Sequence, residues 1–296
     1  MWRKPWTLKE GFTICLGMVV AGLMLELSVG PVDWNSFAWP VNGIVLIGFL
    51  MLIIGFYFFR KKVYAFRFLS TYHAAIPTMV FAVILTIVMG LTRQVENGVW
   101  LNNMLSFWPF VIIYVYMAVI LGLVVCKQIA SRSFLKSLFS CNALLFHLGL
   151  FMTMTTATLG NADIQRLMMI TEKGETEWRG IDKNQTVVEL PLAIELKQFI
   201  MEVYEDGSPK RFASEIQVLT KSGKNIMTTV DVNKPVEVEG WKIYQYGYDT
   251  AKGAMSNISI LELVRDPWLV YVYIGIGMML LGALGMLFTG VRRKKR

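Results

Sequence analysis

One histidine lies inside an otherwise apolar stretch of the chain. His147 stands between Phe146 and Leu148 in the segment NALLFHLGLF, residues 142–151. A neutral imidazole in hydrocarbon needs a polar partner, because burying an unpaired polar group costs about 2–7 kcal/mol. Ionisable side chains within membrane spans therefore usually mark functional sites. The chemistry open to this ring is hydrogen bonding or the ligation of a metal ion.

The helix face around His147 is apolar and aromatic. At about 100° per residue, His147 shares a face with Ala143, Leu150, Phe151 and Met154. A haem iron takes a neutral imidazole as axial ligand, and its macrocycle packs against hydrophobic and aromatic walls. Two hypotheses stay open on the residues alone. His147 ligates haem iron, or it is hydrogen-bonded to a hydroxyl or carbonyl of a neighbouring helix.

The composition around this histidine is that of a polytopic membrane protein. Of the 296 residues, 55% are hydrophobic, and the mean hydropathy is +0.50, which is too apolar for an ordinary soluble chain. A helix needs about 20 residues to cross the hydrocarbon. Apolar stretches of that length predict six spans, at 11–29, 41–59, 74–91, 106–126, 138–159 and 268–290.

Lysine and arginine gather on one side of these spans, in the segments 3–9, 60–67, 127–136 and 292–296. In the opposite short loops, 30–40 and 92–105, Arg93 is the only basic residue. Cytoplasmic loops carry the excess of basic residues, so we expect a cytoplasmic (inner) membrane protein with both termini in the cytoplasm. The net charge of +8 belongs to this rim, where it meets anionic lipid, and it predicts no nucleic-acid binding.

Residues 160–267 lack a membrane-length apolar run and form one domain, which this topology places outside the cytoplasm, in the periplasm. From Thr186 onward the period of the apolar residues changes from 3.6 to 2, and the turn clusters EDGSPK, KSGK and VNKP punctuate it. The pattern predicts short antiparallel strands packed as a β-sandwich-like domain. The alternating apolar positions include Ile194 and Leu196, Ile216 and Val218, Val236 and Val238, and Ile258 and Ile260.

The most aromatic part of this domain is EGWKIYQYGYDTAKG, residues 239–253. Alternate rings would fill the core of the domain while the others face outward. Alternatively, the exposed tyrosines form a docking face for another protein. The three cysteines, Cys15, Cys126 and Cys141, lie in or at membrane spans, so the exported domain has no cysteine for a disulfide.

The other histidine, His73, is at the cytoplasmic end of its span, in STYHAAIP. His147 stands some ten residues into its helix, about 15 Å deeper. The two rings are therefore poorly placed to hold one iron from opposite sides, and a second axial ligand is expected from another chain. For His73 we expect an interfacial ring that reaches water.

Haem also carries two propionates, which need cationic partners. Arg132 and Lys136, on the cytoplasmic side of His147, could meet them, although topology alone explains both residues. Met152 and Met154 are expected to pack rather than to bind iron.

Two stretches resemble the ResB (also called CcsB) family of cytochrome c biogenesis proteins. One is LLFHLGLFMTMTTATLG followed by RLMMITEKGE, similar to the histidine-bearing helix of the family and the strand after it. The other runs from VNKPVEVEGWKIYQYGYDTAKG through NISILELVRDPW to the last span. It resembles the closing pattern of the family: an Asn-Lys-Pro turn, an aromatic strand and an Asp-Pro before the final helix. Together the resemblance spans roughly residues 70–290.

The resemblance implies a membrane subunit that moves haem b outward with a CcsA-type partner and attaches it to apocytochrome c. His147 matches the membrane histidine of the family, which ligates haem iron. The family's tryptophan-rich catalytic segment has no counterpart here, so the resemblance implies an accessory subunit rather than the catalytic one, with no catalytic residue assigned. In these terms the chain divides into an extra transmembrane hairpin (1–69), spans three to five (70–159), the β domain (160–267), and the last span with its basic tail (268–296).

Other functional classes are open to such a chain. The main alternative is a non-catalytic scaffold of a respiratory assembly, whose exported domain binds partners while His147 only packs. A dihaem electron-transfer cytochrome requires paired histidines at matching depth, which His73 and His147 do not offer. Ion transport is disfavoured because Glu26, the one acid within a span, is expected near an outer end where water reaches it.

Overall fold

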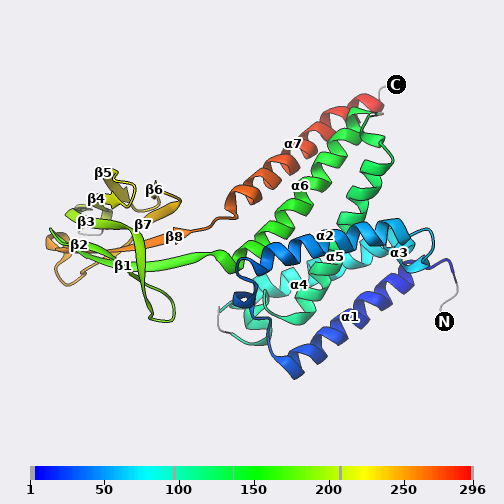
Figure 1. Cartoon of the computed structure of the whole chain (residues 1–296), viewed down its shortest axis with the longest axis horizontal. Coiled ribbons are helices and arrows are strands. Elements are labelled where there is room, and N and C mark those ends of the chain that lie inside the picture. Colours follow the sequence, from blue (N-terminus) through cyan, green and yellow to red (C-terminus); the bar gives the residue numbers. More distant parts are fainter. Residues whose placement is uncertain (1–3, 96–97, 136, 207–208, 295–296) are drawn as a thin grey trace. The chain divides into compact units, whose positions relative to one another are not determined.

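The computed structural model describes residues 4–95, 98–135, 137–206 and 209–294, and these form two compact units. One unit comprises residues 1–162 and 268–296, and the other comprises residues 163–267. Within the described residues, six helices are long and apolar enough to cross a membrane (Figure 1). They are α1 (Leu8–Val29), α2 (Val41–Phe59), α4 (Tyr72–Leu91), α5 (Trp108–Ala130), α6 (Leu138–Gly160) and α7 (Leu269–Lys294). The six predicted helices are thereby confirmed.

Helix α5 lies at the centre of the helical unit, where it contacts α1, α2, α4 and α6. The short helix α3 (Tyr64–Leu69) joins α2 to α4. Local signals begin the helices where the sequence supplies them: a capping box of Thr7 and Glu10 starts α1, and the Ser137 hydroxyl accepts a backbone N–H at the start of α6.

Glu26 is not near water, as its sequence position suggests, but buried, with 6% of its surface exposed. Its Oε2 accepts the backbone N–H of Trp108 at 3.1 Å, at the first residue of α5. The first N–H groups of a helix have no partner within it, and a carboxylate there also meets the positive end of the helix dipole. A residue of α1 thus caps α5, and its carboxylate has a structural role.

Helices α6 and α7 pack in close backbone contact. A Cβ at Gly149 of α6 would lie 2.6 Å from the carbonyl oxygen of Gly275, and a Cβ at Gly282 of α7 would lie 2.5 Å from the backbone nitrogen of Phe146. Small residues allow this approach in a membrane, where van der Waals packing rather than water exclusion drives helix association. The small residues on these two spans therefore have a packing role.

The other unit is an antiparallel β domain whose strands lie between α6 and α7 in the chain. All eight described strands form one hydrogen-bonded sheet in the order β5-β4-β3-β2-β1-β8-β7-β6. The strands are β1 (Gln165–Glu172), β2 (Thr176–Ile181), β3 (Val187–Val203), β4 (Pro209–Thr220), β5 (Asn225–Asp231), β6 (Val236–Val238), β7 (Trp241–Tyr248) and β8 (Ile258–Arg265). The separate antiparallel domain is confirmed, and it is built from one continuous sheet.

This sheet curls until its two ends meet. Strand β5 contacts β6 and β7, and the Ser222 hydroxyl of the β4–β5 turn donates to Glu239 of the β6–β7 turn. The enclosed core draws apolar residues from all the described strands except β2. Its fully buried members include Met169, Ile194, Leu196, Ile216, Val218, Ile243, Leu261 and Leu263.

The alternation predicted for β3, β4 and β6 is confirmed, but that of β8 is reversed. Leu261 and Leu263 face the core, whereas Ile258 and Ile260 lie half-buried on the other face. The reason is the buried Ser259, which occupies a core position that hydropathy assigns to solvent. Its hydroxyl bonds the Ser214 hydroxyl at 2.7 Å and the Gln245 amide at 3.0 Å, so the buried polar groups satisfy one another.

The aromatic segment divides between the two faces of β7. Trp241 is buried in the core, as the packing interpretation predicts, while 64% of Tyr246 is exposed. Tyr248 stacks on Phe199 of β3, with ring centroids 4.8 Å apart. The domain thus keeps an outward ring available without leaving the whole segment as a docking face.

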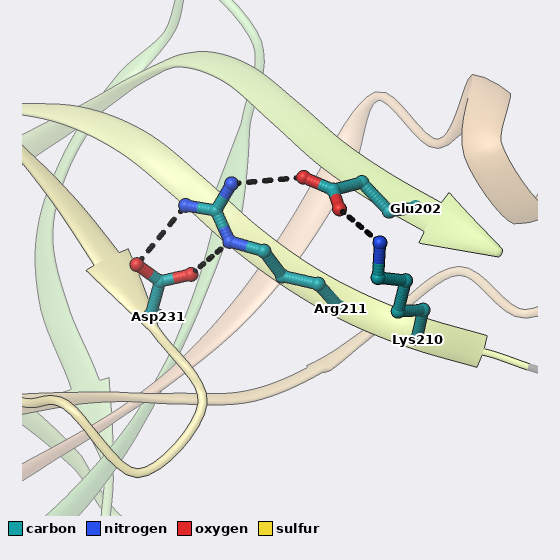
Figure 2. A network of polar contacts seen from close by, with 4 residues as sticks. All are labelled: Glu202, Lys210, Arg211 and Asp231. Atoms are coloured by element: carbon teal, nitrogen blue, oxygen red, sulfur yellow. Dashed lines mark hydrogen bonds and ion pairs between the residues drawn. The ribbon is translucent and has the colours of Figure 1, made fainter. Parts of the chain in front are cut away.

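An ion network joins β3, β4 and β5 (Figure 2). The Arg211 guanidinium donates to both carboxylate oxygens of Asp231, at 2.5 and 3.1 Å, and to Glu202 at 3.1 Å. Lys210 lies 3.7 Å from the other oxygen of Glu202. Arg211 holds the pKa of Asp231 below its usual range through these hydrogen bonds.

A leucine at Gly282 should separate α6 from α7. Its Cβ would meet the backbone of Phe146, which cannot move aside as a side chain can, and such overpacking costs about 1–3 kcal/mol. We expect the purified Gly282→Leu variant to melt several degrees below the parent in detergent. Gly277→Leu is the matched control, because nothing lies within 4 Å of a Cβ there; equal melting of the two variants would contradict the packing.

Acid should loosen the β4–β5 pair through Asp231. The folded pKa of Asp231 is depressed, so its contribution to stability is present above the unfolded pKa of about 3.9 and is lost as the pH falls through the folded pKa. We expect hydrogen-exchange protection of β4 and β5, corrected for intrinsic rates, to fall toward pH 3. Asp231→Asn should remove this component, whereas Glu175→Gln, at an exposed position, should keep it.

Candidate functional site

His147 lies on α6 and is half-buried. Its Nδ1 atom is 2.6 Å from the backbone carbonyl oxygen of Ala143, one turn earlier on the same helix. The amide nitrogen of Gln128 on α5 lies 3.2 Å from the same ring atom. The histidine therefore contacts its own helix and α5 through one nitrogen.

The Ala143 contact favours one position of the proton on the ring. A carbonyl oxygen can only accept a hydrogen bond, so this contact needs the proton on Nδ1, and the Gln128 amide group then meets Nδ1–H through its oxygen rather than its nitrogen. The lone pair then belongs to Nε2. Metal-ligating histidines have this arrangement, in which one nitrogen donates to a backbone carbonyl while the other faces the metal. Through Nε2, His147 is therefore the candidate ligand of this site.

His147 lies level with the last turn of α5. Gln128 is two residues from the end of α5 at Ala130, yet it reaches the ring of His147. His147 is about ten residues from the start of α6, but it lies beside a residue only two positions from the end of α5. The helices are staggered, and this stagger brings the imidazole toward the level of the basic rim.

The face that His147 shares is only partly available as a wall. Phe151 and Met154 are buried in a cluster with residues of α2 and α5, and Phe151 stacks on Phe49 at a centroid distance of 6.4 Å. Phe146 meets the imidazole edge to face at 5.6 Å. The aromatic surroundings predicted for the ring are present, but Phe151 and Met154 pack between helices and Leu150 packs against the same cluster.

His73 lies elsewhere, at the start of α4. Its ring is 3.9 Å from that of Tyr72, and its carbonyl oxygen faces Gly11 of α1. Pro77 stands four residues later and has no N–H to bond that carbonyl. The surroundings of His73 therefore come from α1 and α4, whereas those of His147 come from α5 and α6.

Of the two cations considered as propionate partners, Arg132 is exposed in the turn after α5, at a φ of 49°. Lys136 lies outside the described residues. Within the described part of the chain, no three His, Cys, Asp or Glu side chains gather as a metal site. The three cysteines are free thiols.

Two polar residues near this site escaped prediction. Gln128 sits next to the basic end of α5, where sequence gives no reason to single out an amide. Arg60, at the end of α2, reads as a topology signal, but its guanidinium stacks on the Tyr57 ring at 3.6 Å. The only sequence signal for either is a polar side chain bordering an apolar span.

The fold and site together define a class: a multi-pass helical membrane protein with an antiparallel β domain between its last two long helices. The helix before that domain carries a histidine whose Nδ1 contacts a backbone carbonyl. Residues 137–260, from just before α6 into β8, match the model of the ResB-like family. The resemblance to the ResB/CcsB family is thereby confirmed, over a narrower range than residues 70–290.

Curated relatives agree with this match. The chain is 28% identical over 119 residues to the cytochrome c biogenesis protein CcsB of Prochlorococcus marinus subsp. pastoris (strain CCMP1986 / NIES-2087 / MED4), covering 40% of this chain and 27% of the relative. It is 30% identical over 108 residues to CcsB of Prochlorococcus marinus (strain NATL1A), covering 36% of this chain and 24% of the relative. The matches thus span about a quarter of the length of these relatives.

A solved structure, the cytochrome c heme lyase CcmF, aligns with a TM-score of 0.38 and 14% identity, over 83% of this chain and 45% of that one. Similarity at that level does not establish a shared fold.

The tautomer of His147 is directly measurable, because the chain has two histidines. We expect ¹⁵N solid-state spectra of histidine-labelled His73→Asn protein in lipid, near neutral pH, to show a protonated Nδ1 and an unprotonated Nε2. The hydrogen bond to Ala143 is the physical reason. A ring protonated at Nε2 would contradict this assignment.

Proposed function

We propose that this protein is a haem-handling subunit of a cytochrome c synthase in the cytoplasmic membrane. It helps to move haem b outward and to attach it to apocytochrome c with a CcsA-type partner. The ResB-like match of residues 137–260 and the CcsB relatives support this proposal. Haem is the cargo of the protein rather than a resident cofactor.

The observation that carries the proposal is the 2.6 Å contact between Nδ1 of His147 and the backbone carbonyl oxygen of Ala143. Because Nδ1 donates to the Ala143 carbonyl, Nε2 offers iron a lone pair without any change of tautomer. The carbonyl also orients the ring, as second contacts of metal-bound histidines do. The proposed role is one axial ligand, and the second would come from the partner chain.

The described part of the chain supplies binding groups rather than an acid–base pair beside His147. We therefore assign it an accessory role in the synthase and no catalytic residue. Its β domain, in the periplasm, would meet apocytochrome c or the partner, and the exposed Tyr246 is a suitable contact residue.

The second candidate function is a membrane scaffold of a respiratory assembly. One observation favours it: Phe151 and Met154 pack against α2 and α5, so this part of the histidine-bearing face serves helix association. In that case the imidazole only packs and hydrogen-bonds to Ala143, and it binds no metal.

Haem occupancy separates the two functions. Purified with its partner, the parent protein should carry haem, and His147→Ala should lose most of it, because the variant lacks the Nε2 lone pair. Added imidazole should restore the Soret absorbance by filling the vacated position. His73→Ala is the matched control and should keep its haem. Unchanged haem in His147→Ala would favour the scaffold.

A further inference from the structure

We infer that Arg60 binds an oxyanion at the end of α2, either a propionate carboxylate of haem or the phosphate of an anionic lipid. The first source rests on the proposed function, and the second does not. The inference starts from one atom: Nη1 of Arg60 is buried and has no hydrogen-bond partner among the described residues. An unpaired donor on a charged group is costly. Arg60 as a whole is only half-buried, so an oxyanion on the accessible side of the guanidinium can neutralise the charge that the chain leaves unpaired.

The guanidinium is also held in place. It lies over the Tyr57 ring at 3.6 Å from Cζ to the centroid, one turn earlier on α2. This cation–π contact fixes the plane of the fork and leaves its N–H edges for ligands. Lys61 and Lys62, which follow directly, are exposed and carry no such constraint. Arg60 is therefore a positioned donor rather than one more charge of the basic rim.

Three acids of the helical unit are occupied elsewhere. Glu10 bonds the N-cap residue Thr7, Glu26 accepts the N–H of Trp108, and Asp33 accepts the N–H of Asn35. Each of these carboxylates therefore serves a helix start, and among the described residues none of them pairs with Arg60. A ligand can therefore supply the counter-ion that Arg60 lacks among the described residues of the helical unit.

The place of Arg60 explains why haem is one of the two sources. Tyr57 of α2, on which Arg60 stacks, packs against the same cluster as Cys126 of α5 and Leu150 of α6. Cys126 is two residues from Gln128, the α5 contact of His147. Arg60 and His147 thus border the same three-helix cluster at the same end of α5. Iron at His147 and a carboxylate at Arg60 would be the two ends of one ligand.

The test compares Arg60→Gln with Lys62→Gln, which removes the same charge two residues later from an exposed position. In the first arm, the full chain with its partner is titrated with haem and with haem dimethyl ester, whose propionates are uncharged. We expect the parent and Lys62→Gln to prefer haem by about tenfold, the worth of one charge-assisted hydrogen bond. Arg60→Gln should bind both equally, while its Soret position, set by His147, stays unchanged.

In the second arm, the same proteins are taken from nanodiscs of phosphatidylcholine with phosphatidylglycerol, and retained lipid is counted by native mass spectrometry. Loss of phosphatidylglycerol in Arg60→Gln alone, with ester discrimination intact, identifies the lipid phosphate as the source. Arg60→Lys, which keeps the charge, and the melting temperature of Arg60→Gln guard against misfolding.

The outcomes are distinct. If Arg60→Gln behaves like Lys62→Gln in both arms, the oxyanion site is wrong. If no variant binds haem, the proposed function fails, and the lipid arm alone decides whether Arg60 holds an oxyanion.

Discussion

The close packing of α6 against α7 is the constraint on which the rest of the molecule depends. Hydrocarbon gives two apolar helices no reason to associate by excluding water, so contact must come from shape, and glycines supply it at Gly149, Gly275 and Gly282. Helix α6 carries His147, and the two helices bracket the β domain in the chain. This interface therefore fixes the position of the His147 imidazole. It also fixes where the chain leaves α6 and where it enters α7.

In the β domain, the first and last strands pair with each other. Gln165 of β1 pairs with Arg265 of β8, and the ladder continues to Glu172 and Ile258. The fully buried apolar core of the domain and the hydrogen bonds of its serine–glutamine network stabilise it from within. The helical unit differs: in its described part, Glu26, Gln128 and Arg60 each bury a polar group or atom near a helix end.

Hydropathy predicted the helices and the separate β domain well, because hydrocarbon thickness leaves little freedom for a spanning segment. It failed where a polar residue is buried by partners distant in sequence. Ser259 shifted the expected inward face of β8, and Glu26 caps a helix that starts 82 residues later. The aromatic surroundings of His147 were predictable from helical spacing, but the roles of Phe151 and Met154 were not, since they depend on which helix packs alongside. Nor could spacing predict that Nδ1 of His147 meets the Ala143 carbonyl, the contact on which the expected tautomer rests.

The pairing of β1 with β8 also affects the order of folding during synthesis, because β8 is the last strand of the domain to be made. The two strands are separated by all the others, and the helix pair α6 and α7 by the whole domain. During synthesis α6 enters the bilayer without its partner, and its glycine face stays uncovered until the last helix emerges. In the proposed topology the β domain crosses the membrane in that interval, so α6 meets α7 only afterwards. The β domain would then be complete before the helical unit can finish packing.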